Sequence, residues 1–258
     1  MSRKNQPMSK FILSMLFAAA ALAVSCNAQP EPSCPAVQYK TPKGGKLDIY
    51  MITHGSVAMS YKGFSVQVDP VGKMGQTEFD YTQFPKADLI LITHEHGDHL
   101  SADTIELLSK DDTQILLNAK SRDQLGKGEA IANGESRKVG PVGVTAVPAY
   151  NISEGRQNFH PKGNGNGYIL DFDGFKVYVA GDTEDIDEMA SFGPVDVAFL
   201  PVNQPYTMTT TQCIEAALTL KPKVLIPYHM SQTDIQEVKT VLDANDSGIE
   251  VLLFEELR

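Results

Sequence analysis

The chain has 258 residues, of which 42% are hydrophobic, so it is long enough to bury the core of one large domain. Its net charge is −10, with 22 basic against 32 acidic side chains. Because contacts to phosphate backbones depend on clustered lysine and arginine, this acidic balance argues against nucleic acid as a partner.

Residues 1–25 have the pattern of a targeting segment. Three basic residues, Arg3, Lys4 and Lys10, precede an apolar run from Phe11 to Val24 that is too short to span a bilayer comfortably. The segment holds three of the 22 basic residues and no acid, so its removal leaves 19 basic against 32 acidic residues, or a net charge of −13. We therefore expect an exported bacterial protein with a strongly acidic body.

The end of this segment leaves two kinds of cleavage open. Residues 22–26, Leu-Ala-Val-Ser-Cys, resemble a bacterial lipoprotein box, in which the cysteine, here Cys26, carries lipid and becomes the mature N-terminus. Ordinary cleavage, for example after Ala28, would instead give a free periplasmic protein. A lipid on Cys26 would be the protein's only contact with a membrane. Residues 26–45, rich in proline at their start, are predicted to be a tether to a domain at 46–258.

The chain contains three cysteines: Cys26, Cys34 and Cys213. If Cys26 carries lipid, the other two are either free or paired with each other. Cys213 falls in a helical pattern, which favours a small buried apolar side chain over a metal ligand. No Cys-x-x-Cys spacing occurs, so a thiolate metal site is not supported.

The first predicted elements are a strand and a hairpin. Residues 46–53 form the strand, which ends at His54-Gly55. Residues 56–61 and 64–69 form the hairpin around a Lys62-Gly63 turn.

The next apolar run, residues 87–93, carries the most informative stretch of the chain at its end. The run is apolar on both faces, which is typical of a buried strand in a covered sheet. Residues 93–100, Thr-His-Glu-His-Gly-Asp-His-Leu, then place three imidazoles and the Asp98 carboxylate within six positions. A short loop at the carboxyl end of a strand is where α/β proteins place their chemistry.

This spacing suits metal ions. His94 and His96 are two residues apart, so in an extended segment their rings point to the same side. Gly97 allows a sharp turn, after which Asp98 and His99 could serve a second ion. Imidazole and carboxylate ligands without thiolate suit Zn²⁺, Fe or Mn²⁺, and Zn²⁺ is the default for a histidine-rich site.

The pattern His-x-His-x-Asp-His resembles the signature of the metallo-β-lactamase superfamily of metallohydrolases. The resemblance implies that Asp69, in the Asp69-Pro70 pair that ends the hairpin, lies beneath the metals and orients their ligands. It also places His54 near the rim of the pocket. There His54 would contact the substrate or support the ligands, whereas a histidine at a strand end is otherwise more often a structural hydrogen-bonding residue.

The remaining elements alternate between strands and helices. Ser101 is predicted to cap a helix that runs to Leu108. Strands are expected at 114–118, at 136–149 in two parts separated by Gly140-Pro141, and at 168–172, 175–180, 196–201, 223–229 and 249–254. Further helices are expected near 121–125, at 210–220 and at 233–244.

The glycine-rich loop at 158–167 contains His160 and Lys162. It resembles the segment that supplies the third histidine of the first metal in a subgroup that includes ascorbate-phosphate lactonases and the N-acyl-phosphatidylethanolamine phospholipase D type. By this resemblance His160 is the third ligand of the first metal. Lys162 would either meet an anionic group of the substrate or remain solvated.

Two further predicted ligands directly follow strands. Asp182 comes after the strand at 175–180 and matches the carboxylate that bridges both metals in the superfamily. His229 comes at the end of the strand at 223–229 and matches the final ligand of the second metal. The resemblance thus assigns His94, His96 and His160 to metal one, Asp98, His99 and His229 to metal two, and Asp182 to both.

The resemblance implies a four-layer αβ/βα sandwich and a hydrolase with two divalent ions, Zn²⁺ by default and Mn²⁺ or Fe otherwise. A metal-bridging hydroxide would attack a small or lipid-like ester, lactone or phosphodiester. Asp98 would orient this nucleophile or accept its proton, so Asp98 and His54 are the candidate catalytic residues. β-Lactam hydrolysis is less favoured, because the loop around His160 resembles the lactonase-like subgroup. The alternatives are an iron dioxygenase on the same scaffold and an exported metal-binding lipoprotein without catalysis.

Overall fold

The strand predicted before the histidine cluster lies inside a seven-stranded sheet in the computed structural model, which describes residues 32–258. Four antiparallel strands form one side of this sheet and parallel strands form the other. In spatial order the strands are β1 (Ala36–Lys40), β2 (Lys46–Thr53), β3 (Ser56–Tyr61), β4 (Phe64–Val68), β7 (Leu89–Ile92), β8 (Gln114–Leu117) and β9 (Glu129–Ala130).

A second seven-stranded sheet faces the first. Its strands are antiparallel from β10 to β13 and parallel from β13 to β16. In spatial order they are β10 (Ser136–Val139), β11 (Val142–Ala149), β12 (Gly165–Phe172), β13 (Phe175–Val179), β14 (Val197–Pro201), β15 (Val224–Tyr228) and β16 (Glu250–Val251).

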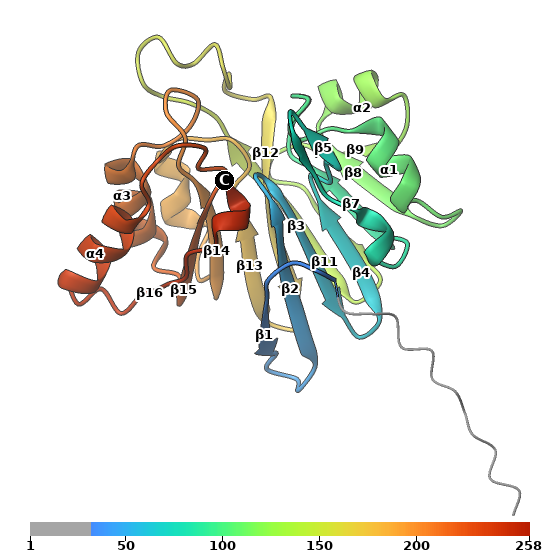
Figure 1. Ribbon diagram of the computed structural model, residues 1–258, viewed down its shortest axis with the longest axis horizontal. Helices are drawn as coiled ribbons and strands as arrows, with labels where there is room; N and C mark the ends of the chain where they lie inside the picture. The colour runs from blue at the N-terminus through green and yellow to red at the C-terminus, as the bar shows by residue number, and fades with distance from the viewer. Residues whose placement is uncertain (1–31) are drawn as a thin grey trace, which may run out of the picture. The chain divides into compact units, whose positions relative to one another are not determined.

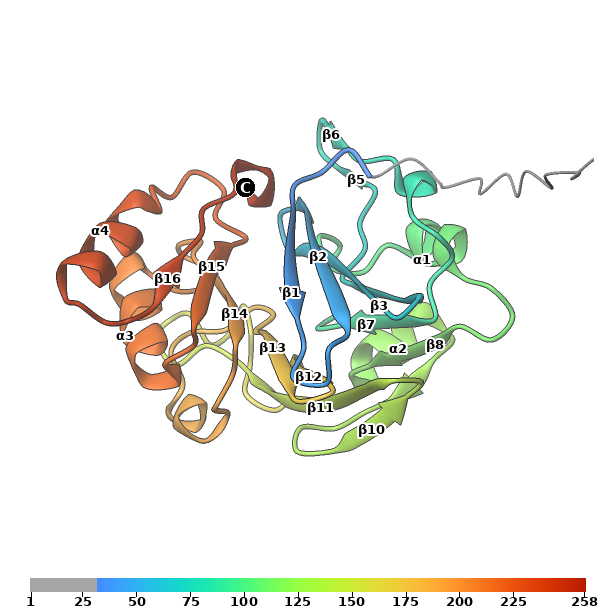
Figure 2. The same ribbon diagram turned by 90° about the horizontal axis from the view of Figure 1, so that it is seen from below.

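Helices cover the outer faces of both sheets, so the expected four-layer αβ/βα sandwich is confirmed. Helices α1 (Ala102–Leu108) and α2 (Ala119–Leu125) lie outside the first sheet, and α3 (Thr210–Leu220) and α4 (Gln236–Ala244) lie outside the second (Figures 1 and 2). Residues 32–258 also contain short elements: the hairpin of β5 (Lys73–Met74) and β6 (Thr77–Glu78) and the 3₁₀ turns η1 (Tyr81–Gln83), η2 (Asp187–Ser191) and η3 (Glu255–Leu257).

Strand β7 shows why the sandwich forms. Its four side chains are all fully buried. Leu89 and Leu91 belong to the large core between the sheets, whereas Ile90 and Ile92 belong to a second core that includes Ile105 of α1. Because successive strand residues point to opposite faces, this continuous apolar run is what a sheet covered on both sides requires.

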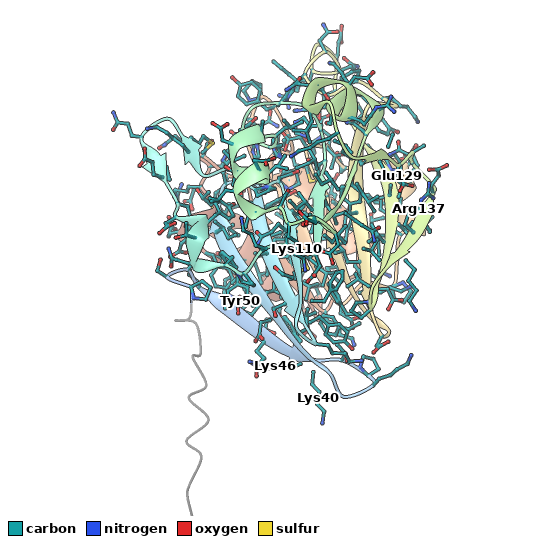
Figure 3. The ribbon with its side chains drawn as sticks, turned by 90° about the vertical axis from the view of Figure 1, so that its right-hand side faces the viewer. Lys40, Lys46, Tyr50, Lys110, Glu129 and Arg137 are labelled. Carbon is teal, nitrogen blue, oxygen red and sulfur yellow. The ribbon has the colours of Figure 1, made fainter. Side chains whose placement is uncertain are left out.

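The sheets are also joined at their edges. Arg137 of β10 donates to Glu129 of β9, with its Nε atom 2.9 Å from the carboxylate, and the two side chains lie side by side in Figure 3. Both groups are exposed, so the pair contributes little to stability. It marks the place where the chain passes from one sheet to the other.

The predicted tether is too long. Residues 36–40 form β1, which pairs antiparallel with β2, so the folded domain begins before residue 46. The segment alternates between exposed and half-buried side chains, and Tyr39 packs on Phe175 with the ring centroids 5.0 Å apart. Its short, half-exposed pattern on a sheet edge gives a weak strand signal in the sequence. The targeting segment and Cys26 lie outside the described residues.

Other predictions are refined by local contacts. Cys34 and Cys213 are both free, and Cys213 is buried as expected. The last strand, β16, is shorter than predicted. It pairs with β15 only as far as Val251, because the chain then turns and η3 packs against β2. Within residues 32–258 no helix is long and apolar enough to cross a membrane.

Candidate metal centre

The predicted ligands converge at one edge of the sandwich, where strands of both sheets end. His94, Asp182 and His229 follow β7, β13 and β15, and His54 follows β2. Asp98 and His99 lie in the turn after β7. His160 comes from the long loop between β11 and β12, drawn in yellow-green at the top of Figure 1. The structure therefore brings all seven predicted ligands together, although they are spread over more than half of the chain.

His94, His96 and His160 form one group, as predicted for metal one. Their ligand atoms all lie within 4.8 Å of one another. Nε2 of His94 lies 3.0 Å from Nδ1 of His96. Two nitrogens that share a tetrahedral zinc ion at about 2.0–2.1 Å would lie roughly 3.3 Å apart, so this pair is spaced for one ion.

The buried carboxylate of Asp182 lies between the histidines of both predicted metal sites. Its Oδ2 atom is 3.1 Å from Nε2 of His160 and 3.4 Å from Nε2 of His229. Its Oδ1 atom is 3.3 Å from Nε2 of His99. The two oxygens of one side chain thus face ligand atoms from both groups.

Gly181 makes this placement of Asp182 feasible. Its φ is +65°, in the left-handed region. A Cβ atom there would lie 2.8 Å from the carbonyl oxygen of Asn166 and 2.9 Å from Cβ of Thr93. Both the backbone angle and the space exclude a side chain, so glycine is required immediately before the carboxylate.

The second group differs in part from the predicted one. Ligand atoms of His54, Asp98 and His229 lie within 4.8 Å of one another. Oδ2 of Asp98 is 3.4 Å from Nε2 of His54 and 3.5 Å from Nε2 of His229. His99 is 3.9 Å from Asp98 and groups instead with His94 and Asp182. His54 therefore joins the predicted metal-two residues, and His99 lies between the two groups.

Four of the histidines are held from behind through Nδ1. The Nδ1 atom of His99 donates to Asp69, that of His160 to the Tyr206 carbonyl, and that of His94 lies 3.0 Å from Oγ1 of Thr93. The Asn203 amide lies 3.3 Å from Nδ1 of His229. In each case the remaining Nε2 atom faces the site. For His99, His160 and His94 the oxygen partner on Nδ1 fixes both the tautomer and the orientation of the ring, as is usual for metal-binding histidines, whereas the Asn203 nitrogen fixes only the orientation of His229.

Four of the atoms that face the site have no hydrogen-bond partner. Among the described residues, Nε2 of His99, His160 and His229 and Oδ1 of Asp182 are buried without a hydrogen bond. Leaving a buried polar atom unpaired costs about 1–3 kcal/mol, so four of them around one space call for a ligand. A set of imidazole and carboxylate donors fits divalent transition-metal ions, which would satisfy all four.

The electrostatics suit metal binding by three of these residues, His94, His96 and Asp182. Burial and the neighbouring His99 hold the pKa of His94 well below its ordinary value, and burial also lowers the pKa of His96. Burial by itself would raise the pKa of Asp182, but His229 and His99 outweigh it and hold that pKa well below the ordinary value. His94 and His96 are therefore neutral and Asp182 ionised near neutral pH, which are the protonation states that bind metal.

A cavity of about 470 Å³ opens directly above these groups. Its lining includes six of the residues described above: His54, His96, Asp98, His160, Asp182 and His229. The remaining lining residues, which sequence reasoning did not assign to the site, are Met74, Phe159, Asn203, Tyr206 and Ser231. The volume lies within the range of about 300–1,000 Å³ that is typical of small-molecule sites.

Lys162 does not reach the cavity. Its Nζ atom lies 2.9 Å from the Tyr150 hydroxyl and 2.9 Å from the Glu188 carboxylate. In the loop before α3, Tyr206 lines the cavity, whereas the side chain of Met208 is fully buried. The interpretation of Lys162 as an anion contact is therefore not supported, because this lysine is already paired with a carboxylate.

Comparison with known proteins agrees with this geometry. Residues 48–229 match the family described as Beta-lactamase superfamily domain. A UPF0173 metal-dependent hydrolase of Thermococcus kodakarensis is 35% identical over 153 residues, which cover 56% of this chain and 67% of the relative. The relative from Archaeoglobus fulgidus, also a UPF0173 metal-dependent hydrolase, is 30% identical over 185 residues, which cover 66% of this chain and 80% of the relative.

Solved structures of metal-dependent hydrolases are also similar to this chain. A crystal structure from Parabacteroides distasonis, named as a metal-dependent hydrolase, has 49% identity and a TM-score of 0.83, and the match covers 87% of this chain and all of the other. Igni18, a metallo hydrolase of the archaeon Ignicoccus hospitalis, has 26% identity and a TM-score of 0.68, with 82% of this chain and 96% of the other covered.

Proposed function

Because the chain belongs to the beta-lactamase superfamily domain family and is a metal-dependent hydrolase of that fold, we propose that it uses two divalent ions to cleave an ester, lactone or phosphodiester. His94, His96 and His160 would hold the first ion. Asp98, His99 and His229 would hold the second, with Zn²⁺ as the default metal. Asp182 would contact both.

One observation carries this proposal: the position of the Asp182 carboxylate. It lies within 3.1–3.4 Å of histidines that belong to both groups, and a single ion would leave one of these groups without a partner. A carboxylate that faces donors of both sets is suited to contact two ions. The buried, unpaired Nε2 atoms on either side of it support the same interpretation.

Divalent ions held by these residues would supply a hydroxide near neutral pH and would polarise the carbonyl or phosphoryl group of the substrate. The chain's own residues would position the nucleophile and take up its proton. The Asp98 carboxylate is about a third exposed at the cavity, so it can reach both a nucleophile and solvent. It would orient the nucleophile and accept its proton.

His54 would keep Asp98 in position. Its ring packs against that of His229 with the centroids 3.7 Å apart, and its Nε2 atom lies 3.4 Å from Asp98. The backbone adds to this link, because the carbonyl of His54 accepts the His229 N–H. Both residues have φ near +50°, an uncommon conformation that is found preferentially where function requires it.

We also propose that the protein acts outside the cytoplasm. This proposal depends on the basic and apolar pattern of residues 1–25, with Cys26 as the residue that would carry a lipid anchor. Metabolic labelling with a lipid precursor would test it. Incorporation that is lost in Cys26→Ser supports the anchor, and absence of label with a mature N-terminus near residue 29 supports simple cleavage.

The hydrolase proposal is tested by metal removal and restoration. Protein treated with a chelator should lose hydrolysis of p-nitrophenyl acetate, a simple lactone and bis(p-nitrophenyl) phosphate, and added Zn²⁺ or Mn²⁺ should restore at least one of them. His96→Ala should not be restored. Recovery only with iron and oxygen, without hydrolysis, would contradict the proposal and favour oxygen chemistry.

A further inference from the structure

We propose that the cavity binds substrates whose non-reacting part is an uncharged aryl or alkyl group, so that the natural substrate is a neutral apolar ester or lactone. This inference rests on the proposed hydrolase function and adds the substrate class. It concerns the lining side chains that are not predicted ligands and carry large apolar surface, namely Met74, Phe159 and Tyr206, here called the apolar wall.

This wall is apolar and open to solvent. The structure describes five large hydrophobic side chains as exposed, and the two aromatic ones among them, Phe159 and Tyr206, both line this cavity. They are 36% and 46% exposed. Their rings meet edge to face with the centroids 5.0 Å apart, which leaves ring surface available to a ligand. Exposed aromatic surface at a concave site indicates recognition of an apolar group.

The wall is fixed relative to the metal centre. The Tyr206 carbonyl accepts hydrogen bonds from Nδ1 of His160 at 3.0 Å and from the Asn151 side-chain amide at 2.7 Å. Phe159 directly precedes His160, and the His160 carbonyl accepts the Asn151 N–H. The same contacts that orient a metal ligand therefore position the two rings. An apolar group would meet a preorganised surface, which reduces the entropy lost on binding.

The cavity lacks what a second anionic group would need. No lysine or arginine is present among the described residues that line it. Lys162 is paired with Glu188. Beyond the predicted metal ligands and His54, the polar side chains of the lining are Asn203, Tyr206 and Ser231, and Asn203 already donates to Ser231 at 3.1 Å. A phosphate or carboxylate far from the reacting bond would thus be desolvated without a cationic partner.

A matched pair of substrates tests the proposal. p-Nitrophenyl hexanoate and the p-nitrophenyl monoester of adipic acid share the leaving group, the reacting carbonyl and the six-carbon chain, and differ in a terminal carboxylate. We expect kcat/KM for the hexanoate to exceed that for the adipate monoester by about tenfold or more, because its chain is buried against the apolar wall. Equal values, or a preference for the adipate monoester, would overturn the proposal while leaving the hydrolase function intact.

Variants of the apolar wall test whether its side chains cause the preference for the hexanoate. The double variant Phe159→Ala, Tyr206→Ala should reduce the hexanoate-to-adipate ratio towards one, with the metal content unchanged. Leu218→Ala, which removes an exposed apolar side chain on α3 outside the cavity, is the matched control and should keep the wild-type ratio. A ratio that is unaffected by the double variant would place the selectivity elsewhere and contradict the role of this wall.

A binding measurement separates the substrate class from the hydrolase function. Hexanophenone and 6-oxo-6-phenylhexanoic acid mimic the two esters but have no bond to cleave. Titration calorimetry on the metal-loaded protein should show at least about tenfold tighter binding of hexanophenone. If neither ester is cleaved but hexanophenone binds in this way, the hydrolase proposal fails and the apolar site remains. If the acid binds as tightly, the apolar site is wrong.

Discussion

Oδ2 of Asp69 lies 2.7 Å from Nδ1 of His99, and neither side chain is exposed to solvent. Asp69 also accepts the backbone N–H of Thr93 at 2.8 Å and its hydroxyl at 2.6 Å. Burial would lower the pKa of His99, but the carboxylates of Asp182 and Asp69 outweigh it and hold that pKa well above its ordinary value. One carboxylate beneath the site thus fixes both a predicted ligand and the residue preceding His94.

Replacing Asp69 by asparagine should weaken metal binding although Asp69 does not face the cavity. An asparagine amide can accept only through its oxygen, so its NH₂ group would face a donor of Thr93 or His99. We expect metal affinity to fall by about 10–100-fold. Competition with a fluorescent chelator measures this change. Asp173→Asn, at the exposed end of the β12–β13 hairpin, is the control, and equal affinities in the two variants would disprove the role of Asp69.

Gly181→Ala should be strongly destabilising. The alanine would have to adopt a φ of +65°, and its Cβ atom would lie 2.8 Å from the Asn166 carbonyl oxygen. Gly155→Ala is a matched control, because Gly155 has φ of +78° but nothing within 4 Å of a new Cβ. Urea unfolding of both metal-free variants should show a free energy of unfolding at least about 2 kcal/mol lower for the Gly181 variant. Similar values would mean that the space around Gly181 can relax.

Glu184→Gln should loosen the loop that carries His160. The fully buried Glu184 carboxylate accepts the N–H groups of Ile152 and Ser153 at 2.7 and 2.6 Å. Loss of its charge weakens both hydrogen bonds, because charged acceptors bind more strongly than neutral ones. Hydrogen exchange of residues 152–159, followed by mass spectrometry, should become faster. Glu188→Gln, which alters the carboxylate paired with Lys162, is the control and should not speed up this exchange. Unchanged hydrogen exchange in Glu184→Gln would refute the role of Glu184 in holding the loop.

Cys34 should react slowly with thiol reagents. Burial raises its pKa to about 11, so the reactive thiolate is scarce at neutral pH and increases about tenfold with each pH unit up to that value. At pH 8 we expect iodoacetamide to modify Cys34 on the order of a hundredfold more slowly than an exposed cysteine of pKa about 8.5. Mass spectrometry of the modified peptide measures the rate, with urea-unfolded protein as the control. A modification rate equal to that of free cysteine would contradict the burial of Cys34 and place it in a flexible tether.

The sequence predicts the fold and most of the site because both are encoded locally. Apolar strands such as residues 89–92 are evident from their composition, and the predicted ligands at positions 94, 182 and 229 directly follow such strands. Parallel strands end at a common edge, so their final residues meet. The strand at 36–40 escapes prediction, because a half-exposed edge strand of five residues has little pattern of its own.

The rest of the site depends on contacts between distant segments. Asn203 reaches His229, and the Tyr206 carbonyl reaches His160, across 26 and 46 positions of the chain. A backbone carbonyl has no sequence signature, and asparagine in a loop is usually unremarkable. His54 contacts Asp98 and His229 only because β2 and β15 belong to sheets that face one another. Such pairings follow from the packing of the two sheets, which no local pattern encodes.

The number of metal ions per chain tests the central claim most directly. Elemental analysis of the purified protein, after loading with Zn²⁺ and removal of excess metal, should give two ions per chain. His96→Ala and Asp98→Ala should each retain about one ion, because they remove a donor from different groups. One ion in the wild-type protein, with full hydrolytic activity, would contradict the two-ion account and show that Asp182 serves a single metal.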